Sequence, residues 1–192
     1  MTGRTVVLLA HGSADPRHAA DIEALADRVR QRLDEHVVTA YLDHNPPSVG
    51  LVARALAPGT EVVLVPLLLT DGYHLRVDVP RAAGELSAGH RVTVTAALGP
   101  DPAVDEAVAE LGRRGAGPTV AVRPCASPEE VTALPSGDEQ VVVAQVLARG
   151  TLRDRIAQRC HEQGLRLADG ALATTEVLTR LVVRRVTDAA GL

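Results

Sequence analysis

The sequence has almost no aromatic side chains: it contains two tyrosines and no phenylalanine or tryptophan among 192 residues. Hydrophobic residues nevertheless make up 46% of the chain, so a folded core has to be built from Val, Leu and Ala. Aliphatic runs of this kind are typical of parallel sheets that are buried on both faces. A chain of this length accommodates one sizeable domain or two small lobes.

An excess of basic charge and long apolar runs are also absent. The net charge of −4 gives no electrostatic reason to bind nucleic acid or an anionic membrane, both of which require clustered Lys and Arg. No stretch approaches the ~20 apolar residues of a membrane span, and the run from Val6 to Ala10 is too short for a signal-peptide core. We therefore expect a cytoplasmic protein with a small-molecule partner.

Cysteine and nucleotide-binding motifs are scarce as well. Cys125 and Cys160 lack the close spacing of a zinc knuckle or a redox motif, and two thiols do not make a disulfide framework. We expect both to be core or surface residues in a reducing compartment. Because the sequence contains no Gly-rich P-loop, we expect no nucleotide cofactor and no ATP requirement.

Hydrophobic periodicity predicts strands that alternate with helices in the first half of the chain. Strands are expected at 5–10, 37–42, 61–69 and 91–98, and helices at 17–33, 49–56, 79–86 and 103–114. This order predicts an α/β fold with a parallel sheet and right-handed crossovers.

The second half resembles a shorter copy of the first. Strands are expected at 119–122 and 140–147, with a helix starting at Pro128 between them. Placing Gly150 on Gly72 aligns the later strand with the third strand of the first half, but nothing corresponds to the opening strand and long helix.

We therefore predict two lobes, of which the second is truncated. The first lobe is expected at residues 1–116 and the shortened, degenerate second lobe at 117–192. The boundary falls in a polar stretch that contains glycines and ends in proline, as is usual between compact units.

Polar residues follow the first three predicted strands, at the edge where parallel sheets bind ligands. His11 follows the first strand, Asp43 and His44 follow the second, and Gly72 and His74 follow the third. Neutral imidazoles bind first-row divalent metals, and a nearby carboxylate can complete the coordination or accept protons. The pattern predicts His11 and His74 as ligands and Asp43 as a catalytic carboxylate, with His44 as an alternative.

Other candidates have a plainer interpretation. His18, His36, His90 and His161 do not follow a predicted strand directly, and we expect them to be solvated. Arg17 either pairs with a substrate carboxylate or, as we favour, with Asp21 one helical turn away.

Two motifs of the first half resemble those of a known family. They are Val6-Val7-Leu8-Leu9-Ala10-His11-Gly12-Ser13-Ala14-Asp15-Pro16-Arg17 and Val65-Pro66-Leu67-Leu68-Leu69-Thr70-Asp71-Gly72-Tyr73-His74-Leu75-Arg76-Val77-Asp78-Val79-Pro80. Together they resemble the CbiX/SirB family of sirohydrochlorin cobaltochelatases and ferrochelatases. The resemblance implies a class II chelatase fold of two Rossmann-like lobes around a cleft. It also implies metal binding by His11 and His74, and places Asp43 where some members use an acidic residue, commonly Glu.

The resemblance implies that the protein inserts Co²⁺ or Fe²⁺ into a sirohydrochlorin-type tetrapyrrole, with the divalent metal as a substrate. We expect Ser13, Arg17, Gly72, Tyr73 and Arg76 to contact the tetrapyrrole, the two arginines near its carboxylates and Tyr73 either stacked on a ring or filling space. The shortened second half leaves open a homodimer that completes the cleft, or a carrier of metal or tetrapyrrole without turnover. A flavodoxin-like domain that binds a phosphate-bearing ligand is a third hypothesis.

Overall fold

The computed structural model of the chain describes residues 4–70, 72, 74–116, 120–135, 139–189 and 191, and for residues 74, 115 and 116 it describes the backbone alone. Its elements run in the order β1 (Thr5–Ala10), α1 (Pro16–Arg30), β2 (His36–Tyr41), α2 (Val49–Ala55), β3 (Glu61–Pro66), η1 (His74–Asp78), α3 (Val79–Ser87), β4 (Arg91–Val94), α4 (Pro102–Ala116), β5 (Ala121–Cys125), α5 (Pro128–Thr132), β6 (Gln140–Ala144), α6 (Thr151–Glu162), β7 (Arg166–Leu167), η2 (Leu172–Thr174) and α7 (Glu176–Ala189).

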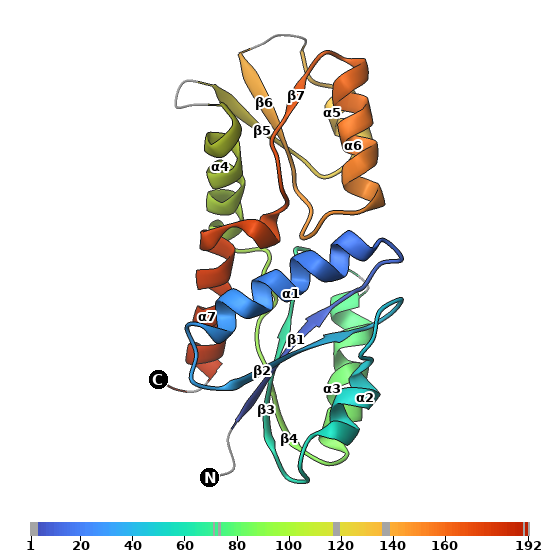
Figure 1. The fold of residues 1–192 in the computed structure, drawn as a ribbon, viewed down its shortest axis with the longest axis vertical. Helices are drawn as coiled ribbons and strands as arrows, with labels where there is room; N and C mark the ends of the chain where they lie inside the picture. Colours follow the sequence, from blue (N-terminus) through green and yellow to red (C-terminus); the bar gives the residue numbers. More distant parts are fainter. Residues whose placement is uncertain are drawn as a thin grey trace.

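The strands form two parallel sheets, one in each half of the chain (Figure 1). The larger sheet has the order β2-β1-β3-β4 and the smaller has the order β5-β6-β7. The predicted α/β fold with two parallel sheets is therefore confirmed, and so is the shorter second half, whose sheet has three strands where the first has four. Within the described residues no helix is long and apolar enough to cross a membrane.

Strand β1 lies in the middle of the first sheet and is buried along its whole length. Val6 and Leu8 pack with residues of α1 and α7, whereas Val7 and Leu9 pack with residues of α2 and α3. Figure 1 shows these two pairs of helices on opposite sides of the sheet. Because both faces are covered, the strand has a continuous apolar sequence, with no alternation of polar and apolar residues.

One hydrophobic cluster is shared by the two halves, because their last helices are exchanged. Helix α4 follows the first sheet but packs against β5 and β6 of the second, while α7 returns from the second half to pack on β3 and α1. A single cluster of buried side chains accordingly joins Leu8 of β1, Val141 of β6, Leu111 of α4 and Val182 of α7. The division of the chain at residue 116 stays a prediction.

The strand ends near the second half differ from the prediction. Strands β3 and β4 end at Pro66 and Val94, several residues before the ends expected from their apolar sequence. Beyond them the backbone N–H of Gly99 donates to the carbonyl of Leu68, and a side chain on Gly99 would collide with the carbonyl of Leu69. The segment after β3 and the segment after β4 therefore lie too close together for regular strand pairing, and each continues as a loop.

The structure contains two further features that the predicted elements do not include. Residues 74–78 form a π-helical turn directly before α3. Such turns are rare in proteins, and those that occur are often found at functional sites. In the second half, the order β6-α6-β7-α7 repeats β3-α3-β4-α4, in agreement with the alignment of Gly150 on Gly72.

Candidate functional site

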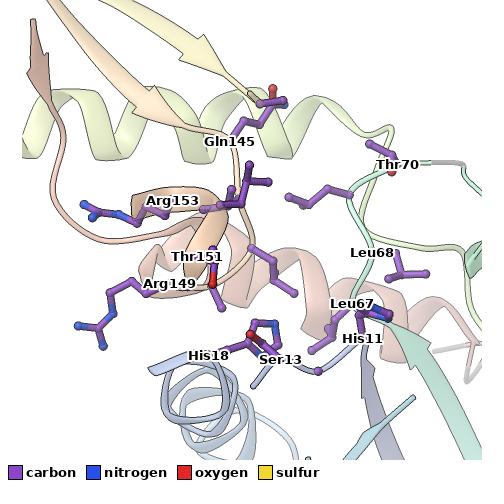
Figure 2. A pocket seen from close by; sticks show the side chains of 18 residues that line it. His11, Ser13, His18, Leu67, Leu68, Thr70, Gln145, Arg149, Thr151 and Arg153 are labelled. Carbon is purple, nitrogen blue, oxygen red and sulfur yellow. The ribbon is translucent and has the colours of Figure 1, made fainter. Parts of the chain in front are cut away.

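A cavity of about 470 Å³ lies where the carboxyl ends of the two sheets face each other. Its lining comes from residues 11–13, 18 and 67–70 of the first half and from residues 126 and 145–153 of the second. Figure 2 shows the loop after β6 on one side and the ends of β1 and β3 on the other. The volume falls within the range of roughly 300–1,000 Å³ that is usual for small-molecule sites.

The walls of the cavity are mainly apolar and come from both halves. Leu67, Leu68 and Leu69 follow β3, and Val146 and Leu147 follow β6. Polar side chains line the rest of the cavity, among them His11 at the end of β1. Apolar surfaces with a few convergent polar groups suit a ligand that is largely apolar and is contacted at particular atoms.

His11 is held in a backbone turn that only glycine permits. The carbonyl of His11 accepts a hydrogen bond of 2.9 Å from the backbone N–H of Asp43. The next residue, Gly12, has a φ of +96°, and a side chain there would collide with the carbonyl oxygen of Asp43. The Ser13 N–H then donates to the Asn45 side chain at 2.7 Å. The loop after β2 therefore fixes the position of His11.

The same turn leads into α1, whose first residues reach the second half. Asp15 caps the helix by accepting from the Arg17 N–H at 2.9 Å, and the side chain and backbone of Arg17 lower the pKa of Asp15 to about 2. The Arg17 guanidinium also forms an ion pair with Asp154 of α6. The predicted pairing of Arg17 with Asp21 is therefore wrong, because Arg17 faces the second half and Asp21 has another partner.

That partner is Arg149, in the loop that lines the cavity. Asp21 is 4% exposed and accepts hydrogen bonds from the Arg149 backbone N–H at 2.8 Å and from its guanidinium at 2.6 Å. These bonds raise the pKa of Arg149. Sequence reasoning missed this pair, although Asp21 stands four residues before Leu25 on the buried face of α1, and that spacing was the available signal.

His18 is a second histidine of the cavity, and the expectation that it is solvated is wrong. The ring is half-buried and lines the cavity together with His11. Burial lowers the pKa of His18, and the nearby His11 lowers it further. Among the described residues no partner bonds its buried Nδ1 atom. The signal was again periodicity, because His18 precedes Ile22 and Leu25 at the spacing of one helix face.

The other predicted site residues of the first three loops lie in different surroundings. Ser13 lines the cavity, and its hydroxyl accepts from the Asp15 N–H at 3.1 Å. Asp43 is exposed and is not part of the described lining; its carboxylate accepts from the backbone N–H of His44 at 2.8 Å and lies 3.5 Å from the His44 ring. The roles of Asp43 and His44 stay predictions.

The loop after β3 is described only in part. The backbone of His74 begins the π-helical turn, and Arg76 on that turn is exposed. The side chain of His74 and the whole of Tyr73 lie outside the described residues. Gly72 is described and does not belong to the cavity lining. The predicted roles of these four residues therefore remain untested.

The remaining histidines and both cysteines lie away from the cavity lining. His36 and His161 are exposed, as predicted, whereas His90 is half-buried, with Nε2 2.9 Å from the carbonyl of Ala53. Cys125 and Cys160 are buried in one hydrophobic cluster, which confirms them as core residues. Burial raises the pKa of Cys125 to about 11. Among the side chains that are described, no three of His, Cys, Asp or Glu form a metal-binding group.

Comparison with known proteins adds independent findings. A model of the CbiX family matches residues 5–114. A sirohydrochlorin cobaltochelatase of Sulfurisphaera tokodaii is 29% identical over 108 residues, which make up 55% of this chain and 85% of that protein.

Solved structures are similar over nearly the whole chain. The sirohydrochlorin chelatase SirB from Bacillus subtilis subspecies spizizenii, in complex with cobalt, has a TM-score of 0.76 at 16% identity and covers 98% of this chain and 96% of its own. SirB from Bacillus subtilis with Fe³⁺ has a TM-score of 0.75 at 16% identity, with coverage of 98% and 96%. At such identities the likeness shows the fold.

Proposed function

Because the chain belongs to the CbiX family, we propose that it is a sirohydrochlorin chelatase, which inserts Co²⁺ or Fe²⁺ into a sirohydrochlorin-type tetrapyrrole. The observation that carries the proposal is the position of His11, which lines a largely apolar cavity between the two halves. The relative from Sulfurisphaera tokodaii is a cobaltochelatase, and SirB structures contain cobalt or Fe³⁺.

In the proposed reaction, the cavity walls and the predicted site residues each have a role. The apolar walls at Leu67 to Leu69 and Val146 to Leu147 can hold the faces of a flat macrocycle. His11, with His74 from the loop after β3, binds the divalent metal through neutral imidazole nitrogens. Insertion forms the metal–nitrogen bonds and releases two pyrrole protons, which Asp43, the imidazoles or water accept. A site with few protein ligands holds the ion weakly and lets it pass to the macrocycle.

The remaining parts of the proposal concern the substrates and their surroundings. Ser13, Arg17, Gly72, Tyr73 and Arg76 are proposed to contact the tetrapyrrole, and the arginines to lie near its carboxylates. For Arg17 this requires that its ion pairs with Asp15 and Asp154 open or are shared. We further propose that insertion needs no ATP and takes place in the cytoplasm, by a monomer or a homodimer.

The test is an insertion assay with purified protein, sirohydrochlorin and Co²⁺ or Fe²⁺, followed by the visible absorbance of the macrocycle without added nucleotide. Wild-type protein should convert the spectrum faster than the metal alone. His11→Ala and His74→Ala should each lower the rate by at least about 100-fold, the scale on which a positioned ligand or base contributes.

The matched control is His36→Ala, which removes an exposed histidine at the opposite end of β2 and should leave the rate unchanged. Wild-type rates in both His11→Ala and His74→Ala would contradict the assignment of the site. Tetrapyrrole binding without spectral conversion by the wild type, with either metal, would favour the carrier and reject the enzyme.

A further inference from the structure

We infer that His18 is an additional metal-binding residue of the cavity, which gives the entering divalent ion a second imidazole on the same side as His11. The inference rests on the proposed function, because it concerns the same cavity and the same metal substrate. It adds a residue on a helix, whereas the predicted metal ligands His11 and His74 follow the first and third strands.

The position of His18 follows from the fold. Gly12 and Ser13 turn the chain after β1, and α1 begins at Pro16, so that the first turn of α1 returns to the strand end from which the chain came. Figure 2 shows His18 on α1 and His11 at the end of β1, both on the first-half side of the cavity. Two imidazoles seven residues apart in sequence thereby line one space.

The surroundings of the His18 ring favour a ligand and not a structural role. A structural histidine in a protein interior normally bonds a carbonyl or a carboxylate through at least one ring nitrogen; His90 does so through Nε2 with the carbonyl of Ala53, although its Nδ1 is also buried without a partner among the described residues. The Nδ1 of His18 is likewise buried with no partner in the described part of the chain, but the His18 ring differs from that of His90 in lining the cavity. Since that atom is buried, Nε2 is the nitrogen through which the ring can reach an occupant of the cavity.

The occupant that fits best is a divalent first-row metal. Imidazole nitrogens bind such ions in the neutral state, and the half-buried position next to apolar walls disfavours a charged ring. The carboxylates on either side of His18 in the sequence are already engaged: the N-cap residue Asp15 bonds Arg17, and Asp21, in the second turn of α1, bonds Arg149. The His18 ring therefore remains the donor that the first turn of α1 offers to a cation.

The test is a calorimetric titration of the full-length protein with CoCl₂ in the absence of tetrapyrrole, at about pH 8, where imidazoles are neutral. His18→Phe keeps the volume of the ring and removes both nitrogens, and His18→Ala is the second variant. Both should bind Co²⁺ at least about 10-fold more weakly than the wild type, because even loss of an outer partner of a metal ligand costs 10- to 100-fold.

His36→Ala is the control and should bind Co²⁺ like the wild type, and thermal unfolding verifies that each variant is folded. Wild-type Co²⁺ affinity in folded His18→Phe or His18→Ala overturns the inference. The insertion assay separates it from the proposed function: weakened Co²⁺ binding in a protein that inserts no metal supports His18 as a ligand while rejecting the chelatase. Normal insertion by the wild type, with unchanged Co²⁺ binding in the variants, rejects His18 alone.

Discussion

At the scale of single residues, the site depends on a glycine as much as on a histidine. The φ of +96° at Gly12 lies in a region that side-chain-bearing residues rarely adopt. The carbonyl of Asp43 fills the space that a side chain would need. The turn therefore places His11 at the cavity through close contact between two backbones.

Replacement of this glycine should be unusually costly. Gly12→Ala should lower the free energy of unfolding by more than about 3 kcal/mol, because the strain of an unfavourable φ adds to a collision with backbone. Gly59→Ala is the matched control: Gly59 has a φ of +77° but open space around it, so it should cost only about 1 kcal/mol. Urea denaturation measures both, and equal costs would show that the collision relaxes.

At the scale of elements, α1 connects the two halves. Its buried face packs on the first sheet, while Asp21 and Arg28 reach the second half. Arg28 donates to the hydroxyl of Thr179 on α7 at 3.1 Å, and Asp21 holds the backbone and side chain of Arg149. One helix thus positions His18 and the opposite wall of the cavity at the same time.

Removal of the Asp21 carboxylate should loosen this connection. Asp21→Ala leaves Arg149 without its partner and should destabilise the fold by about 1–2 kcal/mol, less than the loss of a fully buried ion pair, because the Arg149 side chain is 43% exposed. Asp27→Ala on the same helix is the control, because its pair with Arg30 is exposed and should be worth less than about 0.5 kcal/mol.

The double variant Asp21→Ala/Arg149→Ala tests whether the effect belongs to the pair. Since the two side chains bond each other, the double variant should cost clearly less than the sum of the single ones. Additive costs would show that the ion pair contributes little to stability.

At the scale of the whole molecule, the exchange of α4 and α7 joins the halves through a shared hydrophobic cluster. The junction includes a carboxylate: Glu110 of α4 accepts from the backbone N–H groups of Glu176 at 3.2 Å and Val177 at 3.1 Å. It thereby caps the first turn of α7 from another helix. Burial raises the pKa of Glu110, but the two N–H groups and Arg114 outweigh burial and lower it overall.

This cap should make stability depend on pH. Because the pKa of Glu110 is lower in the folded protein than in the unfolded chain, its contribution is present at neutral pH and is lost as the pH falls through the folded value. Glu110→Gln should lower the free energy of unfolding by about 1–2 kcal/mol at pH 7, and the difference from the wild type should shrink below about pH 4.5, the ordinary value for Glu.

Urea denaturation over this pH range is the measurement, with Glu106→Gln as the control. Glu106 is exposed on the same helix, so its variant should unfold like the wild type throughout. A difference between Glu110→Gln and the wild type that stays constant into acid would contradict the charged cap.

The sequence alone determined the alternation of strands and helices and the position of His11, because apolar periodicity and turn residues are local properties of the chain. Strand β1 has the predicted bounds, whereas β3 and β4 end early, since Gly99 and Leu69 approach each other from distant parts of the sequence. Only the tertiary structure decided that His18 lines the cavity, that Asp21 bonds Arg149 and that the last helices are exchanged. Each of these depends on how one half packs on the other, and such packing joins residues that are distant in the sequence, such as Asp21 and Arg149, and that no local pattern connects.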